Sequence, residues 1–292
     1  MRTAIIGLLL SASPLLAQDD ARQVFDSYFG KSRPAATGGA AQSKPEYRPA
    51  TPARRTPAKQ AGSTASKLAG SALGVTIWKM ETPAARDDAR LLVQAGGAAT
   101  EFAPHRMEAG EPLKQGDRVR LSIETPADGY LYVVDQELRA DGALGPPFLI
   151  FPTAITRGGD NHVRSGQLVE IPAQTDPLNV FLVQAKGPSD EGEHLSIILT
   201  PSPIPGLKLT PAAQELAKET FDSWVSNYRT DFQHLELVGG KGKSWTEAEK
   251  QAGMGGAKLL TQADPGPQTI FVFPERAGQP VMAVIRLQIQ QR

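Results

Sequence analysis

The sequence predicts a mainly β protein: an antiparallel β-sandwich-like domain with one or two C-terminal helices and a disordered N-terminal linker. Three observations carry this prediction. Apolar and polar residues alternate in short segments such as RVRLSIE (118–124), a pattern typical of half-buried strands. Turn residues separate these segments, and no long helical pattern comes between them. Residues 31–72, which precede them, hold very few large apolar side chains.

The N-terminus has the layout of a secretory signal peptide over residues 1–17. Arg2 supplies positive charge, residues 4–10 are apolar, and small residues then lead to a predicted cleavage site after Ala17. This apolar stretch is shorter than the roughly 20 residues that span a bilayer, so we expect no transmembrane segment after signal cleavage. The chain contains no cysteine, so it has no disulfide and no site for a lipid anchor. We therefore expect a periplasmic or secreted protein that is not a lipoprotein.

Residues 18–30 are predicted to form a short helix. Val24, Phe25, Tyr28 and Phe29 recur at the spacing of one apolar helical stripe. An isolated helix of this length is marginal in water, so it must dock on the rest of the chain or fray.

Residues 31–72 are predicted to be a disordered, basic linker rich in alanine and proline. Between Lys31 and Lys67 there are eight lysines and arginines, and Glu46 is the one acid. From Leu68 onward the chain has 21 basic and 27 acidic residues, so a basic tether precedes a mildly acidic body. We interpret the linker as a soluble spacer. The alternative is a segment that binds a polyanion or the cell surface.

Residues 73–292 are predicted to form one β-sandwich-like domain. Its expected strands are short and bounded by Asp-Gly, Gly-Gly, proline and asparagine turns. Besides residues 118–124, the segments that read as strands are LGVTIWKM, GYLYVVD, PFLIF, QLVEI, NVFLVQA and HLSIILT.

The C-terminal part of this domain is predicted to hold two helices, at residues 209–229 and 245–252. Thr210 is the expected cap of the first, whose apolar stripe includes Trp224. Ser244 and Glu247 have the spacing of a capping box for the second.

The last two strand-like segments, TIFVF and VMAVIRLQIQ, are predicted to pair as a hairpin around residues 277–280. Two strands and two helices bury little surface alone, so we expect Leu207–Arg292 to complete the first sheet instead of folding separately.

No nucleotide, metal or cofactor site is predicted. The segment ELVGGKGKSWTEAE places Leu237 where a phosphate-binding loop needs glycine, and it lacks a parallel βαβ context. The four histidines, His105, His162, His194 and His234, are far apart in the sequence and form no metal-ligand pair. GGDNH and DQELRADG contain several possible ligands but are typical of turns.

No catalytic residue is assigned, and we expect the protein not to be an enzyme. The sequence has neither a Gly-x-Ser-x-Gly elbow nor a cysteine nucleophile. A triad can still assemble in space from residues that are distant in sequence. Such a hydrolase site would draw on Asp160, His162, Ser165, Glu193 and His194.

Four aromatic residues form the remaining candidate for a ligand groove. Tyr130 and Tyr132 share one face of a predicted strand, and Trp78 and Phe181 lie on others. Tyrosines at this spacing are more often cross-strand packing pairs, which is the interpretation we favour.

Part of the chain resembles a bacterial family known as domain of unknown function 4384. The resemblance covers about Leu113 to Ile204 and includes the segments LKQGDRVRLSIETPADGYLYVVD, FLIFPT, NHVRSGQLVEIP and KGPSDEGEHLSIILTPSPI. It implies a β-sandwich-like accessory module attached to exported or signalling proteins, without catalytic residues. The chain departs from the family pattern at Thr153, where asparagine is usual, and at Gln136–Pro147, which lengthens a hairpin.

Taken together, these observations predict an exported, non-catalytic accessory or interaction module of the bacterial envelope. Its expected partner is another envelope protein or a surface polymer, and not nucleotide or nucleic acid. Two alternatives stay open. One is an envelope hydrolase with a triad assembled from loops, and the other is polyanion or cell-surface binding through the basic linker.

Overall fold

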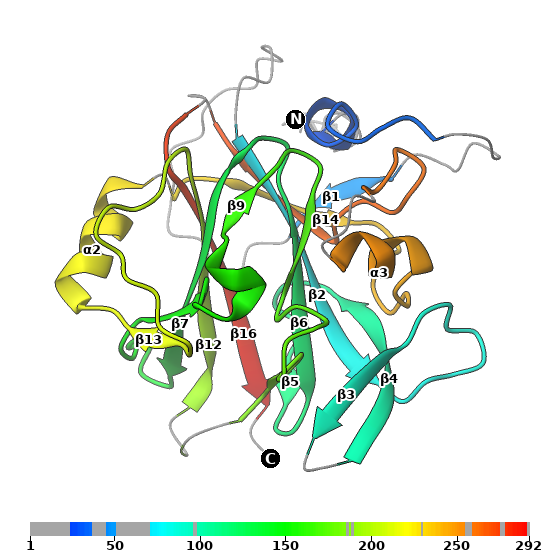
Figure 1. The fold of residues 1–292 in the computed structure, drawn as a ribbon, viewed down its shortest axis with the longest axis horizontal. Coiled ribbons are helices and arrows are strands. Elements are labelled where there is room, and N and C mark those ends of the chain that lie inside the picture. Colours follow the sequence, from blue (N-terminus) through cyan, green and yellow to red (C-terminus); the bar gives the residue numbers. More distant parts are fainter. Residues whose placement is uncertain are drawn as a thin grey trace, which may run out of the picture.

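The computed structural model describes the β domain and two segments that precede it. The described residues are 24–36, 45–50, 71–95, 98–184, 187, 190–228, 230–254, 259–274 and 278–290. The predicted signal peptide lies outside them. The mainly β, sandwich-like prediction is confirmed, because two sheets share one core and helices lie on opposite sides of the molecule (Figure 1).

The first sheet has nine strands, and its central strand, β2, pairs with β15, β4 and β6. All its pairings are antiparallel. Its strands are β1 (Tyr47–Pro49), β2 (Ser71–Glu81), β3 (Leu91–Ala95), β4 (Ala98–Met107), β6 (Arg118–Glu124), β10 (Leu168–Ile171), β11 (Phe181–Leu182), β14 (Gln233–Leu237) and β15 (Thr269–Phe273).

The second sheet has seven strands, with β12 at its centre between β7 and β16. Its pairings are antiparallel except for the parallel contact between β5 and β16. Its strands are β5 (Leu113–Lys114), β7 (Gly129–Arg139), β8 (Phe148–Phe151), β9 (His162–Val163), β12 (Asp190–Thr200), β13 (Gln214–Glu215) and β16 (Val281–Gln290). A short 3₁₀ segment, η1 (Thr156–Gly159), precedes β9.

The core lies between the two sheets and follows from the period-two alternation of the strands. Leu121 and Ile123 of β6 face inward from the first sheet, and Val133 and Ile197 do so from the second. All four are fully buried. Burial of such side chains stabilises the fold by roughly 1.5–3 kcal/mol each.

Helix α2 (Lys218–Asn227) covers the outer face of the second sheet, and α3 (Glu247–Gly253) covers that of the first (Figure 1). Both predicted helix boundaries need correction. Helix α2 begins after Ala217 and not after Thr210, because β13 pairs with β8 before the helix starts. Helix α3 is capped by Thr246 with Glu249 in place of the predicted pair, which lies two residues earlier.

The predicted short N-terminal helix is present at residues 24–28 and docks on the first sheet. The four aromatic and aliphatic side chains of its predicted stripe are buried, next to Leu235 and Ile270. The prediction of a disordered linker over residues 31–72 is wrong where the structure describes it, because Arg33 and Tyr47 are buried and β1 pairs with β14. Residues 37–44 and 51–70 of this predicted linker lie outside the described residues.

The predicted C-terminal hairpin is wrong. Strand β15 pairs with β14 and β2 in the first sheet, whereas β16 pairs with β12 and β5 in the second. The chain therefore crosses between the sheets after Phe273. The segment after Leu207 contributes strands to both sheets and does not form a separate unit.

Candidate functional site

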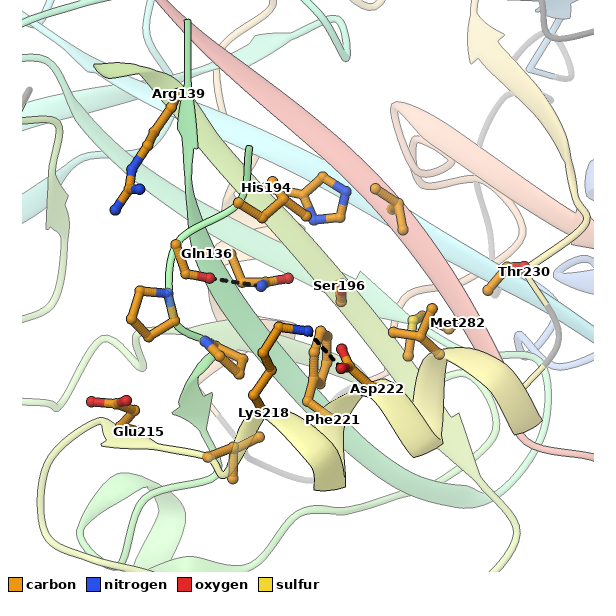
Figure 2. Close-up of a pocket in the computed structure, with 17 residues that line it drawn as sticks. Gln136, Arg139, His194, Ser196, Glu215, Lys218, Phe221, Asp222, Thr230 and Met282 are labelled. Carbon is orange, nitrogen blue, oxygen red and sulfur yellow. Dashed lines mark hydrogen bonds and ion pairs between the residues drawn. The ribbon is translucent and has the colours of Figure 1, made fainter. Parts of the chain in front are cut away.

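A groove of about 910 Å³ lies between helix α2 and the outer face of the second sheet (Figure 2). Strands β7, β12 and β16 form its floor, and α2 forms one wall. The other wall is the segment 144–147, which follows β7. The volume falls within the roughly 300–1,000 Å³ of typical ligand sites.

Arg139 lines the groove from the end of β7, and three further polar side chains lie on its floor: Gln136, His194 and Ser196. Strand alternation places them on the outer face, and Gln136 is the cross-strand partner of His194. Gln136 Nε2 donates a 2.9 Å hydrogen bond to the Gly145 carbonyl, which ties the wall to the floor. Burial lowers the pKa of His194, and the charge of Arg286 lowers it further, so the imidazole is neutral at neutral pH.

The rest of the lining is mostly apolar and partly open to solvent. Leu144 is 40% exposed and Val225 is 44% exposed, and they lie on opposite walls. Figure 2 shows Lys218 and Phe221 extending from α2 toward the strands, with Lys218 paired to Asp222 at 2.6 Å. The other apolar lining residues are Pro146, Pro147, Leu216, Met282 and Val284.

This arrangement is suited to binding a partly apolar ligand. The apolar walls offer surface to bury, and a few polar groups on the floor can fix its orientation. His194 and Ser196 are neighbours on one strand face, but within the described residues no hydrogen bond joins them and no carboxylate contacts the His194 ring. His194 Nδ1 is buried without a hydrogen-bond partner there.

The residues that the sequence offered for a hydrolase do not converge. His162 packs against Tyr130 near one end of β7, whereas His194 pairs with Gln136 six residues further along that strand. At 3.3 Å per residue the two histidines are about 20 Å apart. Glu193 lines a cavity on the inner side of the sheet, opposite the groove.

Two members of that set form hydrogen bonds to backbone groups. Asp160 Oδ1 accepts a 2.9 Å hydrogen bond from the His162 N–H, and Ser165 Oγ donates to the Pro126 carbonyl at 2.8 Å. The Asp160 contact is local turn chemistry, whereas the Asn161 side chain of GGDNH donates to the Leu131 carbonyl of β7 at 3.0 Å.

The four histidines are dispersed over the described structure. His105 lies between Glu81 and Asp87, 2.8 and 3.1 Å away, and His234 contacts Glu236 at 2.8 Å. Among the described residues, no group of three or more histidine and carboxylate side chains is arranged to hold a metal ion.

The four aromatic candidates do not line one groove: Tyr130 and Tyr132 pack in the cluster beneath α2, whereas Trp78 and Phe181 pack elsewhere, in agreement with the favoured interpretation. Tyr132 is buried against α2, and its hydroxyl accepts a hydrogen bond from the Ile204 N–H at 2.9 Å. Tyr130 contacts His162 edge-on, 5.1 Å between ring centres. Trp78 belongs to the other sheet, where its Nε1 donates to Ser122 Oγ. Phe181 is half-buried next to the core.

A layer of buried ion pairs covers the outer face of the first sheet. Arg33 pairs with Glu124, Arg106 with Glu249 and Arg120 with Glu170, and in each pair both side chains are almost fully buried. Arg106 lies over the Trp78 ring and Arg120 over the Trp245 ring. The sequence pattern placed the polar residues of β6 on a solvent face, but helix α3 and the N-terminal segment cover them.

Burial of the Glu170 carboxyl raises its pKa to about 7 from an ordinary value of 4.5, and Arg120 offsets this only in part. The folded state therefore keeps the Glu170 proton at a pH where the unfolded chain has lost it. The stability contributed by this group is complete below pH 4.5 and is lost as the pH rises through 7.

Replacing Glu170 with glutamine should remove this pH dependence. Between pH 5 and pH 8, we expect the free energy of unfolding of the wild type to fall by about 2–3 kcal/mol more than that of Glu170→Gln. This follows from about 1.36 kcal/mol for each unit of pKa shift. Urea unfolding of both proteins at each pH measures the difference. Glu247→Gln, at an exposed carboxylate of α3, is the control. Parallel profiles for wild type and Glu170→Gln would contradict the assignment.

The glycine-rich segment after β14 is a turn. Ser244 forms an isolated bridge with His105, and the Lys243 carbonyl accepts a hydrogen bond from the Arg106 N–H.

In the part of the chain that the structure describes, no helix is both long and apolar enough to cross a bilayer.

Sequence reasoning missed the groove, although one signal pointed to it. Gln136–Pro147, which the sequence predicts to be a lengthened hairpin, supplies Gln136 on the floor and a wall of the groove. The other wall comes from α2, which is about 80 residues further along the chain. Only the fold brings these segments together.

Comparisons with known proteins give no identification of the chain. No family model, no curated protein and no solved structure matches it.

Proposed function

We propose that the protein is an exported, non-catalytic interaction module of the bacterial envelope, which binds a partly apolar segment of a partner protein in the groove beside α2. The observation that carries this proposal is the exposure of Leu144 and Val225 on facing walls of one concave surface. Large apolar side chains that face each other across a groove gain free energy when a partner covers them.

The proposed location rests on the sequence features of residues 1–17. Sequencing the N-terminus of the protein purified from its host tests it. A mature chain that starts at Gln18 supports export, and a chain that retains Met1 contradicts it.

Site-specific photo-crosslinking tests the groove directly. Val225 and Val238 are 44% and 45% exposed, but only Val225 lines the groove, so they form a matched pair of positions. We expect benzoylphenylalanine at Val225 to crosslink one envelope protein, because a bound segment would lie against it. At Val238 it should not crosslink that protein. The same product from both positions, or none from either, would contradict the proposal.

The hydrolase alternative is tested with the same purified protein. His194 and Ser196 share the groove floor, so a hidden activity would depend on them. Turnover of a generic ester, peptide or glycan substrate that is lost in His194→Ala or Ser196→Ala would replace the binding proposal with a catalytic one.

Two of the cations on which the polyanion alternative depends are paired with carboxylates within the described residues. Arg33 is paired with buried Glu124, and Arg48 contacts Glu108 at 2.8 Å. Neither contact involves residues 51–67. Polyanion binding that weakens with salt and disappears when these residues are deleted would support the alternative.

A further inference from the structure

A second, polar pocket of about 310 Å³ lies on the opposite sheet from the groove. Strand β10 and the segment 173–175 form one side, and the end of α3 and residue Arg157 of η1 complete it. Gly253 permits the close approach of α3, because a Cβ atom there would lie 2.1 Å from the Glu170 carboxyl group.

Arg157 is held in an unfavourable backbone conformation at this pocket. Its φ is 50°, the one positive φ of a non-glycine residue within the described chain, and Gly158 and Gly159 continue the left-handed run at 66° and 83°. Asparagine and glycine adopt this conformation more easily than arginine does. Strained residues of this kind cluster at ligand sites.

The guanidinium group of Arg157 has poor partners within the described structure. Its NH2 nitrogen is 3.5 Å from the His162 carbonyl oxygen and 3.9 Å from a carboxylate oxygen of Asp160, whose side chain is 62% exposed. Its NH1 nitrogen is buried and has no hydrogen-bond partner. Burial lowers the pKa of Arg157, and the charge of Asp160 offsets this only in part. A buried donor without an acceptor is costly, and an oxygen ligand would satisfy it.

The other titratable group in the pocket wall, Glu170, already has a hydrogen-bond partner. Glu170 Oε2 accepts a 2.7 Å hydrogen bond from Arg120, so this carboxyl group already has a close partner. Gln167 Oε1 accepts from the Arg164 N–H at 3.2 Å, which leaves the Gln167 amide group as a donor. The charge that lacks a close partner in this pocket is therefore the positive one on Arg157.

We infer that this pocket binds a small organic anion through a carboxylate or phosphate head group, with the Arg157 guanidinium as its main partner and the Gln167 amide as a second donor. Guanidinium groups bind both head groups through paired hydrogen bonds. The pocket is larger than either head group alone, so the rest of the ligand lies along the backbone of β10. This site is independent of the groove beside α2.

The test compares wild type with Arg157→Asn in thermal unfolding and in titration with two probes, sodium succinate and inorganic phosphate. Sodium chloride at equal ionic strength is the reference. We expect one probe to raise the Tm of the wild type with concentration, and the more effective one identifies the head group. In Arg157→Asn the affinity should fall roughly tenfold to a hundredfold, as expected for a lost charge-assisted contact.

The same variant separates a ligand-binding role from a structural one. Asparagine tolerates the left-handed backbone and carries no buried charge, so the Tm of Arg157→Asn without probe should exceed that of the wild type. Arg164→Asn, at an exposed arginine seven residues away, should keep the response to the probe. A lower Tm for Arg157→Asn without probe, or no response of the wild type beyond sodium chloride, would overturn the inference.

Discussion

Replacing Arg33 with alanine is expected to lower the free energy of unfolding by about 3–5 kcal/mol, the cost of leaving one member of a buried ion pair alone. Arg33 donates to both carboxylate oxygens of Glu124, at 2.8 and 2.6 Å, and both side chains are only 1% exposed. Its remaining N–H groups donate to the carbonyls of Asp264 and Pro265. The guanidinium also lies over the ring of Phe25.

Arg48 provides a matched control from the same part of the chain. It contacts Glu108 at 2.8 Å, but the two side chains are 51% and 29% exposed. We expect Arg48→Ala to cost less than about 1 kcal/mol, because water and salt screen exposed pairs. Urea unfolding of the two variants and the wild type measures both values. Equal, small losses would contradict the docking of the segment 24–36 on the sheet.

The strands were the part of the fold that the sequence predicted best. In β6, Val119, Leu121 and Ile123 alternate with polar residues, and they face the core as expected. The same alternation gave the wrong environment for the other face, because Arg120 and Glu124 are buried. A period-two pattern reports which residues share a face, but it does not report what covers the polar one.

Errors elsewhere came from contacts between segments that are distant in sequence. Thr210 and Pro211 form a good local helix start, yet the pairing of β13 with β8 delays the helix to Lys218. The buried Arg33 stands in a segment rich in small and basic residues, where local composition favours disorder. Its partner Glu124 is 91 residues away, so no local pattern could reveal the pair.

The candidate sites were hidden for the same reason. The groove joins Gln136 and His194 of two strands to Val225 of a later helix, and the second pocket joins η1 to the end of α3. None of these residues forms a short motif with the others. The sequence did mark Gln136–Pro147 as unusual, and that segment became a wall of the groove.

Replacing Trp224 with alanine is expected to detach helix α2 and so to remove one wall of the groove. The helix has ten residues, which is marginal for an isolated helix in water. It is held on the sheet by Phe221 and Trp224, both buried, and Trp224 also stacks on Tyr228 with 6.3 Å between ring centres. Loss of a buried tryptophan typically costs about 3–5 kcal/mol.

We expect this loss to be mostly local, because the core between the sheets contains no residue of α2. Amide hydrogen exchange should therefore become much faster in α2, while β12 stays protected. Val225→Ala, at an exposed position on the same helix, should leave both rates near those of the wild type. Crosslinking from the groove wall should disappear together with the protection of α2. If Trp224→Ala lost protection equally in α2 and β12, the helix would be an integral part of the core and not a separable wall.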